Sequence, residues 1–238
     1  GAMVDGVPIE GYRVWKAEKG SVLKLGFAKN GVRAYLAFAG GLDVPEVMGS
    51  KSTGLKIKMG GLNGRKLEAG DEIAFVRPAL KLSHLERRRM TPFDYQKKEW
   101  NIRVVLGFQK DYFTGEGINA FFTTPYTILQ DSDRMGYRLE GEPVTCRKTV
   151  DIISDATVPG AIQIPANGKP IILMADRQTT GGYAKLGAVI SADLPLLAQA
   201  GPGNKIRFEQ VSVEEAQSAL RIERKELKKL ERRINRWL

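Results

Sequence analysis

The densest group of residues that could take part in chemistry is the run Asp176-Arg177-Gln178-Thr179-Thr180-Gly181-Gly182-Tyr183, with Lys185 two residues beyond it. It directly follows the apolar stretch of residues 171–174. A polar loop at the end of a buried strand is a common place for a binding site, because the strand holds the loop rigidly.

The residue types in this run suit recognition of a small polar molecule. Asp176 could act as an acid or base or could orient Arg177, whose guanidinium can bind a carboxylate or phosphate with two hydrogen bonds. Gln178 can recognise an amide, the two threonine hydroxyls can donate or accept, and the two glycines let backbone amides approach a ligand. A structured turn, in which Asp and Thr cap, Gly bends and Tyr packs, explains the run equally well.

A second acid, arginine and glycine loop is Asp131-Ser132-Asp133-Arg134-Met135-Gly136-Tyr137-Arg138-Leu139. Asp133 and Arg134 are its candidate functional residues. The alternative is a salt-bridged turn that precedes a strand.

A third group is rich in glycine and hydroxyl residues. It comprises Gly40-Gly41, the run Gly49-Ser50-Lys51-Ser52-Thr53, and Gly60-Gly61-Leu62-Asn63-Gly64-Arg65. Ser50, Ser52 and Thr53 are candidates for ligand binding, but the order of residues is wrong for a P-loop, so nucleotide binding is not predicted.

Composition excludes several kinds of site. The chain has one cysteine, Cys146, and one histidine, His84, so neither an internal disulfide nor a cysteine-based or multi-histidine metal site is expected. His84 lies in a charged segment, which favours a solvated residue over a catalytic one.

The net charge of +10 is concentrated in residues 81–89 and 221–236. The sequence lacks aromatic stacking platforms beside the basic helix, so nucleic acid is not an expected partner. No apolar run is long enough to cross a membrane.

Short β-rich stretches bounded by turn residues predict a mainly β fold. They are residues 12–16, 22–27, 33–38, 73–76, 102–106, 171–174 and 206–208. Asn30-Gly31 and Ala69-Gly70 recur later, in the same order, as Asn167-Gly168 and Pro202-Gly203, which favours two related β units with tight turns.

Four segments follow from this pattern. We predict a first β unit at residues 4–80, a linker at 81–99, a second β-barrel unit at 100–211 and a helix at 212–238. A short helix is also expected from Asp111 to Phe122, with Asp111 as its N-cap. In the last segment Ser212-Val213-Glu214-Glu215 is a capping box, and the apolar stripe that follows predicts an amphipathic helix, either solvated or in a short coiled coil.

The three runs, taken in order over residues 4–212, resemble the KipA-like family, also named allophanate hydrolase subunit 2 and the C-type subunit of 5-oxoprolinase. Further matching runs are Asp111-Tyr112-Phe113-Thr114, Gly160-Ala161-Ile162-Gln163-Ile164-Pro165 and Ile190-Ser191-Ala192-Asp193-Leu194-Pro195-Leu196-Leu197-Ala198-Gln199. The resemblance implies two cyclophilin-like β-barrel units with a few short helices. It also implies that the first unit lacks a segment with which family members begin. Ala184 and Gly187 depart from the residues usual around Lys185.

The resemblance implies partners and three roles. The expected partners are the KipI-like protein, which is the B-type subunit, together with an A-type subunit; a homodimer is also compatible with the sequence. The first role is a cytoplasmic subunit of a bacterial ATP-dependent 5-oxoprolinase, in which ATP is used by the complex and no cofactor is bound by this chain. The second is a regulatory protein that antagonises a KipI-like histidine-kinase inhibitor. The third is a carboxyltransferase for a urea-like substrate, with biotin carried by a partner.

For the first role, Arg177 or Arg134 would bind the substrate carboxylate. Lys185 would stabilise developing negative charge, and Asp176 or Asp133 would transfer protons.

Overall fold

The computed structural model describes residues 1–77, 82–147 and 149–236. The chain divides into two compact units. Unit 1 comprises residues 1–12, 17–34 and 90–234, and unit 2 comprises residues 13–16, 35–89 and 235–238, in each case as far as they are described. The predicted boundary between residues 80 and 81 lies outside the described residues.

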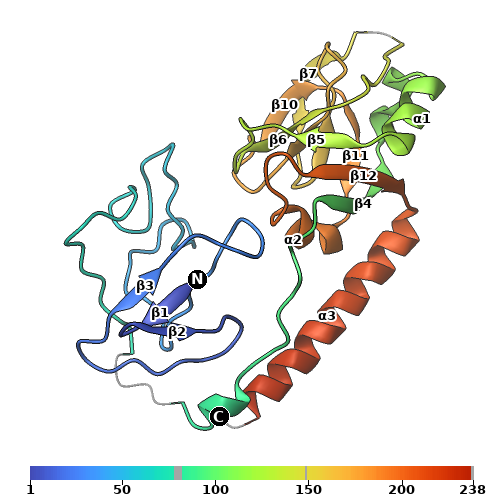
Figure 1. Ribbon diagram of the computed structural model, residues 1–238. Coiled ribbons are helices and arrows are strands. Elements are labelled where there is room, and N and C mark those ends of the chain that lie inside the picture. Colours follow the sequence, from blue (N-terminus) through green and yellow to red (C-terminus); the bar gives the residue numbers. More distant parts are fainter. Residues whose placement is uncertain (78–81, 148, 237–238) are drawn as a thin grey trace. The chain divides into compact units, whose positions relative to one another are not determined.

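The core of unit 1 is a closed β-barrel (Figure 1). Its strand order is β11-β4-β12-β5-β6-β9-β8, and β8 pairs again with β11 to close it. The pairs are antiparallel apart from β12 with β4, which is parallel. The barrel strands are β4 (Glu99–Leu106), β5 (Tyr126–Ile128), β6 (Gly136–Glu140), β8 (Ala161–Gln163), β9 (Ile171–Leu173), β11 (Lys185–Val189) and β12 (Lys205–Gln210). The predicted mainly β fold with a barrel is therefore confirmed.

Two smaller sheets complete the β structure of unit 1. One has the order β2-β1-β3, from β1 (Ala2–Val4), β2 (Val7–Ile9) and β3 (Leu23–Leu25). The other pairs β7 (Asp151–Ala156) with β10 (Thr180–Tyr183), and it directly precedes β8 and β11 in the chain. Its position therefore brings the 176–183 run to the start of barrel strand β11.

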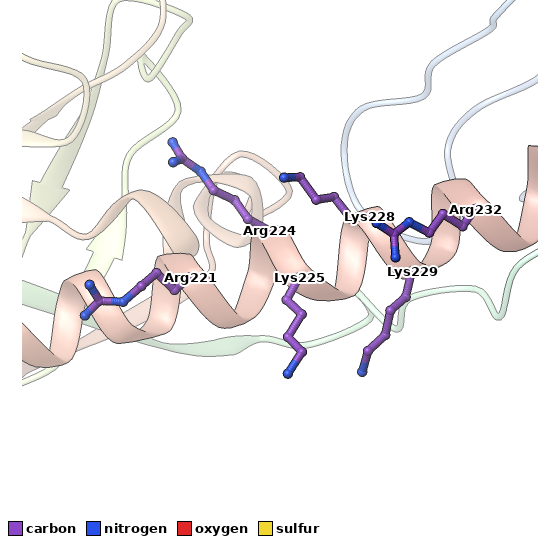
Figure 2. A pocket seen from close by; sticks show the side chains of 6 residues that line it. All are labelled: Arg221, Arg224, Lys225, Lys228, Lys229 and Arg232. Atoms are coloured by element: carbon purple, nitrogen blue, oxygen red, sulfur yellow. The ribbon is translucent and has the colours of Figure 1, made fainter.

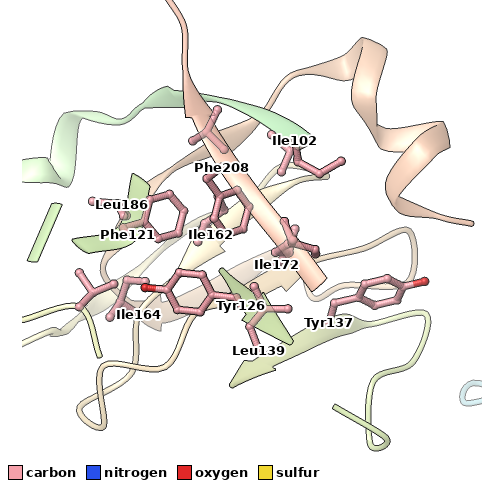
Figure 3. Packing of buried hydrophobic residues seen from close by; sticks show 14 of the residues in the cluster. Ile102, Phe121, Tyr126, Tyr137, Leu139, Ile162, Ile164, Ile172, Leu186 and Phe208 are labelled. Atoms are coloured by element: carbon pink, nitrogen blue, oxygen red, sulfur yellow. The ribbon is translucent and has the colours of Figure 1, made fainter. Parts of the chain in front are cut away.

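Alternating burial explains why these short segments form strands. In β4, Trp100, Ile102 and Val104 are buried whereas Glu99 and Asn101 are exposed, as expected for a strand with one face in a core. Figure 3 shows the side chains that fill the barrel. Phe121 stacks on Phe208 with their ring centroids 4.3 Å apart, and both are buried.

Helices of the described chain are few. They are η1 (Leu85–Arg87), η2 (Phe108–Tyr112), α1 (Gly115–Thr123), η3 (Ser191–Asp193), α2 (Leu194–Leu197) and α3 (Val213–Asn235). The helix predicted from Asp111 begins later, because the side chain of Thr114, not Asp111, caps α1 by accepting a hydrogen bond from Gly117 N. The prediction of Asp111 as the N-cap was wrong.

The C-terminal helix begins at the predicted capping box. Glu215 N donates to Ser212 Oγ, and Ser212 N donates to the Glu215 carboxylate. Helix α3 leaves the barrel directly after β12 (Figure 1). Trp237, expected at the end of its apolar stripe, lies outside the described residues. Among the described helices, α3 included, none combines the length and apolar character needed to cross a membrane.

Three predicted strands of the N-terminal half are absent from the described structure. Residues 12–16 and 73–76 form only the isolated bridges Arg13–Arg89 and Leu42–Phe75. Residues 33–38 form none, because Arg33 N and Val32 N donate to the side chain of Gln199 and not to a neighbouring strand.

The four repeated turn glycines do have the predicted positive φ. The values are 77° at Gly31, 90° at Gly70, 73° at Gly168 and 82° at Gly203. Only Gly168 and Gly203 shortly precede named strands, β9 and β12. Only the turns are therefore repeated, whereas the segments that follow them differ in secondary structure.

Candidate functional site

Two of the predicted polar loops meet in space. Arg134 Nε and Nη2 lie 2.7 and 2.9 Å from the two carboxylate oxygens of Asp176, in a bidentate ion pair. Asp176 N also donates to Arg134 O, so main chain and side chain both join the loops. The expectation that Asp176 orients Arg177 is replaced by this pairing with Arg134.

Lys185 is held by two residues from other parts of the chain. Its Nζ lies 2.8 Å from Asp155 Oδ2 of β7, and its backbone N donates to Gln109 Oε1 over 2.7 Å. Gln109 Nε2 in turn donates to Asp155 Oδ2. The Lys185 ammonium, and secondarily the backbone N–H of Ala156, keep the pKa of the Asp155 carboxyl below its usual value. Asp155 therefore remains a carboxylate at neutral pH.

A buried amide lies beside Lys185. Gln163, the last residue of β8, pairs with Lys185 in the β8–β11 register, and directly opposed residues of an antiparallel pair point to the same face. Gln163 is only 2% exposed, and its Oε1 accepts from Gln178 Nε2 over 3.3 Å. The Gln163 Nε2 group is buried with no hydrogen-bond partner. An unpaired buried donor costs free energy, which a ligand oxygen would recover.

The main chain of the predicted loop is fixed by Thr157. Thr157 Oγ1 donates to Gln178 O over 2.5 Å, and Thr157 N donates to Thr179 O. Arg177, between Asp176 and Gln178, is half-buried, and its Nε is a second buried donor without a partner. This loop therefore holds both Gln178 and Arg177 in place.

A side chain would displace a neighbour at only one of the two predicted glycine positions. A Cβ on Gly181 would lie 2.5 Å from Gln163 Nε2, whereas one on Gly182 would meet nothing closer than Ile152 O at 3.5 Å. Thr180 and Tyr183 are exposed and pair with Ala156 and Asp151 of β7. The close approach at Gly181 makes room for the Gln163 amide.

The structure gives Asp133 the contacts of a turn residue. Its Oδ1 accepts from Met135 N and Gly136 N, which shapes the turn that leads into β6. These contacts place Arg134 for its pairing with Asp176, so a positioning role suits Asp133 better than the expected proton transfer.

Ser50, Ser52 and Thr53 belong to unit 2, whereas the groups just described belong to unit 1. Ser50 Oγ accepts from Ser52 N, and the backbone of Gly60 and Gly61 packs closely on Ser52 and Thr53. A Cβ at Gly60 would lie 2.2 Å from Ser52 O, and the φ of Gly60 is 70°, so both space and conformation require glycine there.

Sequence reasoning missed Gln109, Asp155 and Gln163. Gln163 carried a usable signal, because it is the one polar residue within the apolar stretch of residues 161–164. Asp155 and Gln109 carried none, since only the pairing of β7 with β10 and the position of η2 bring them to Lys185.

Two exposed apolar side chains flank this group in the sequence. Phe108, next to Gln109, is fully exposed, and Ile153, two residues before Asp155, is 95% exposed. Large apolar side chains that gather in one patch are typical of a surface that contacts another protein, whereas single exposed ones are common.

The resulting site is rich in hydrogen-bond donors. It combines Lys185 with the buried amide Nε2 of Gln163 at the edge where β8 ends and β11 begins, and the loop that contacts Gln163 through Gln178 also carries the buried Nε of Arg177. Such a set suits a small ligand with carboxylate and carbonyl oxygens, and its donors could stabilise negative charge that develops on a carbonyl oxygen.

Known proteins with similar sequences are components of enzymes. The chain is 41% identical over 202 residues to the C-type subunit of 5-oxoprolinase from Escherichia coli and 36% identical over 214 residues to that from Haemophilus influenzae. These matches cover 84% and 90% of this chain but 63% and 67% of the two relatives.

A solved structure has a similar fold. The crystal structure of the urea amidolyase of K. lactis superimposes with a TM-score of 0.87 at 28% identity, over 96% of this chain and 15% of that one. Residues 1–210 match the family described as carboxyltransferase domain, subdomain A and B. Because that match spans both units and all strands of the barrel, the chain belongs to the carboxyltransferase domain family.

Proposed function

We propose that this chain is the C-type subunit of a 5-oxoprolinase complex and that its site around Lys185 binds 5-oxoproline. The similarity to the C-type subunits of two bacterial 5-oxoprolinases supports the complex. The observation that carries the site is the buried, unpartnered Nε2 of Gln163 beside Lys185.

The chemistry of 5-oxoproline fits these donors. It has a carboxylate and a cyclic amide, and opening the ring places negative charge on the amide oxygen. Arg177 would bind the carboxylate, while Gln163 Nε2 and Lys185 would stabilise the amide oxygen. Asp176, held by Arg134, is the candidate for proton transfer. ATP would be used elsewhere in the complex, and this chain would bind no cofactor of its own.

A partner protein would cover the exposed side chains of Phe108 and Ile153. Burying them would exclude water from Asp155 and Lys185, which strengthens the electrostatic interactions in the site. We expect this partner to be the KipI-like B-type subunit, while an A-type subunit would complete the complex.

Reconstitution with the A-type and B-type subunits tests the proposal. We expect ATP-dependent release of glutamate from 5-oxoproline by the complete complex, and none when this chain is left out. Phe108→Asp combined with Ile153→Asp should prevent co-purification with the KipI-like protein, whereas Phe27→Asp, at another exposed phenylalanine of unit 1, should not. A complete complex without activity would contradict the proposal.

The likeness to urea amidolyase favours one alternative, transfer of a carboxyl group to a urea-like substrate. Biotin would then be carried by a partner protein. Substrate-dependent ATP turnover distinguishes the two functions, because only the alternative predicts turnover with urea and a biotinylated partner.

A further inference from the structure

Helix α3 has an apolar face that the described chain leaves at least partly exposed: Val213 and Leu227 are exposed, while Leu220, Leu230 and Ile234 are half-buried. Val213, Leu220, Leu227 and Ile234 recur every seven residues, and Ala216, Glu223 and Leu230 follow them at the interval of three that a coiled coil uses. No described residue of α3 is buried, and Leu227 is 54% exposed. The helix lies beyond residue 210, where the family match ends.

The opposite side of α3 is strongly basic. Figure 2 shows six cationic side chains extending from it: Arg221, Arg224, Lys225, Lys228, Lys229 and Arg232. With 3.6 residues per turn, the centre of this basic face lies about 140° from the apolar face. A partner on the apolar face would therefore leave most of these cations in water.

Charges beside the apolar face disfavour a parallel pair of α3 helices. In a parallel coiled coil, Glu226 of one helix would face Glu231 of the other, and Glu223 would meet its own copy in the core. Like charges at these positions are unfavourable.

In one antiparallel register, the charges beside the apolar face attract one another instead. When Leu227 of one helix packs opposite Leu230 of the other, Arg224 faces Glu231 and Glu226 faces Arg233. The two-fold axis repeats each contact, so four opposite-charge pairs surround the two central leucine layers. Glu226 also lies 2.6 Å from Lys229 of its own helix, and its side chain is 60% exposed.

The neighbouring antiparallel registers do not share this property. Moving one helix by seven residues in one direction brings Arg224 opposite Arg224 and Glu226 opposite Glu226. A shift in the other direction brings Glu231 opposite Glu231 and Arg233 opposite Arg233. The charge pattern therefore favours one direction and one register of the two helices. In other helix pairs too, repulsion between like charges disfavours the alternative arrangements.

We propose that two copies of this chain associate through α3 as an antiparallel helix pair centred on Leu227 and Leu230. Burial of the leucine face supplies the attraction, and the Arg224–Glu231 and Glu226–Arg233 pairs set the register. This dimer is independent of the function proposed for the Lys185 site.

Charge reversal and rescue test the dimer with the 238-residue chain. Sedimentation or light scattering should show a wild-type dimer that Leu227→Asp combined with Leu230→Asp converts to a monomer. Arg233→Glu alone should weaken the dimer about tenfold, since it turns two attractive pairs repulsive. Glu226→Arg combined with Arg233→Glu should restore the affinity, and Lys225→Glu, an equal charge change on the basic face, should have little effect.

Several results would overturn the proposal. One is a wild-type chain that stays monomeric at about 100 µM, well above the micromolar range of ordinary association. Another is a dimer that the leucine variants do not weaken. A third is an equal dimer affinity for the single and the double charge variants. A dimer strengthened by Glu231→Arg alone would show that the helices pair in parallel.

Discussion

Arg134 and Asp176 are 42 residues apart in the chain, yet they form a bidentate ion pair that joins the two polar loops of the candidate site. Both side chains are substantially exposed, at 62% and 48%. An exposed pair stabilises a protein by no more than about 1 kcal/mol. Its importance should therefore lie in holding the loop that carries Arg177 and Gln178.

Replacing Arg134 by Gln should separate these two effects. We expect the free energy of unfolding to change by less than about 1 kcal/mol. The kcat/KM of the reconstituted complex should fall by at least about tenfold, in the range expected when a reacting group is misplaced. Glu140→Gln removes the comparable ion pair between Lys169 and Glu140, the last residue of β6, and should leave kcat/KM unchanged. Equal losses in both variants would argue against a positioning role.

Gly181→Ala and Gly182→Ala form a matched pair. The new Cβ at position 181 would lie 2.5 Å from Gln163 Nε2 and must displace that side chain, whereas the Cβ at 182 has ordinary contacts. Because the displaced atom ends a side chain, the stability cost should be below about 1.5 kcal/mol. Substrate affinity, measured as KM in the complex, should worsen only for Gly181→Ala. Identical kinetics for the two variants would show that Gln163 does not contact the substrate.

Gly187 of β11 lies where the neighbouring strand leaves no room for a side chain. A Cβ there would lie 2.4 Å from Val105 O on the neighbouring strand β4, and backbone cannot easily move. Gly187→Ala should lower the free energy of unfolding by about 1–3 kcal/mol, as overpacking does. Denaturant unfolding checks this, with Gly182→Ala as the control. An unchanged midpoint would mean that β4 and β11 separate without cost.

Asp71 in unit 2 should titrate far below an ordinary aspartate. Its carboxylate accepts two hydrogen bonds from Arg65 and one from Glu68 N, which together lower its pKa from 3.8 to about 2. Stability from this pair is present above pH 3.8 and is lost as the pH falls towards 2. The ¹³C shift of the Asp71 carboxyl checks the midpoint, and Arg65→Gln should raise it. A midpoint near 3.8 in the wild type would contradict the pairing.

Local sequence patterns predicted those strands and helices whose pattern of apolar and polar residues follows directly from which side is buried. The stretches at 102–106, 171–174 and 206–208 lie in β4, β9 and β12, and the capping box marks the start of α3. The stretch at 33–38 forms no strand, and at its first residue, Arg33, the backbone N–H and C=O bond the side chain of Gln199, far away in sequence.

The candidate site was predicted only in part for the same reason. The loops of residues 131–139 and 176–183 are polar and dense, so composition alone identified Arg134, Asp176 and Gln178. The partners of Lys185 could not be found locally, because Asp155 and Gln163 come from strands β7 and β8, and register places them beside it.

Lys185, held by Asp155 and adjacent to Gln163, is proposed to stabilise charge on a substrate in a 5-oxoprolinase complex. The most direct test is glutamate release from 5-oxoproline by the complex of the A-type and B-type subunits with the full-length protein. Lys185→Met should lower kcat by about 10²–10³-fold, as loss of a charge-stabilising donor does, without preventing assembly. Lys169→Met, at another ion-paired lysine of unit 1, should retain activity. Full activity of Lys185→Met in an assembled complex would contradict the claim.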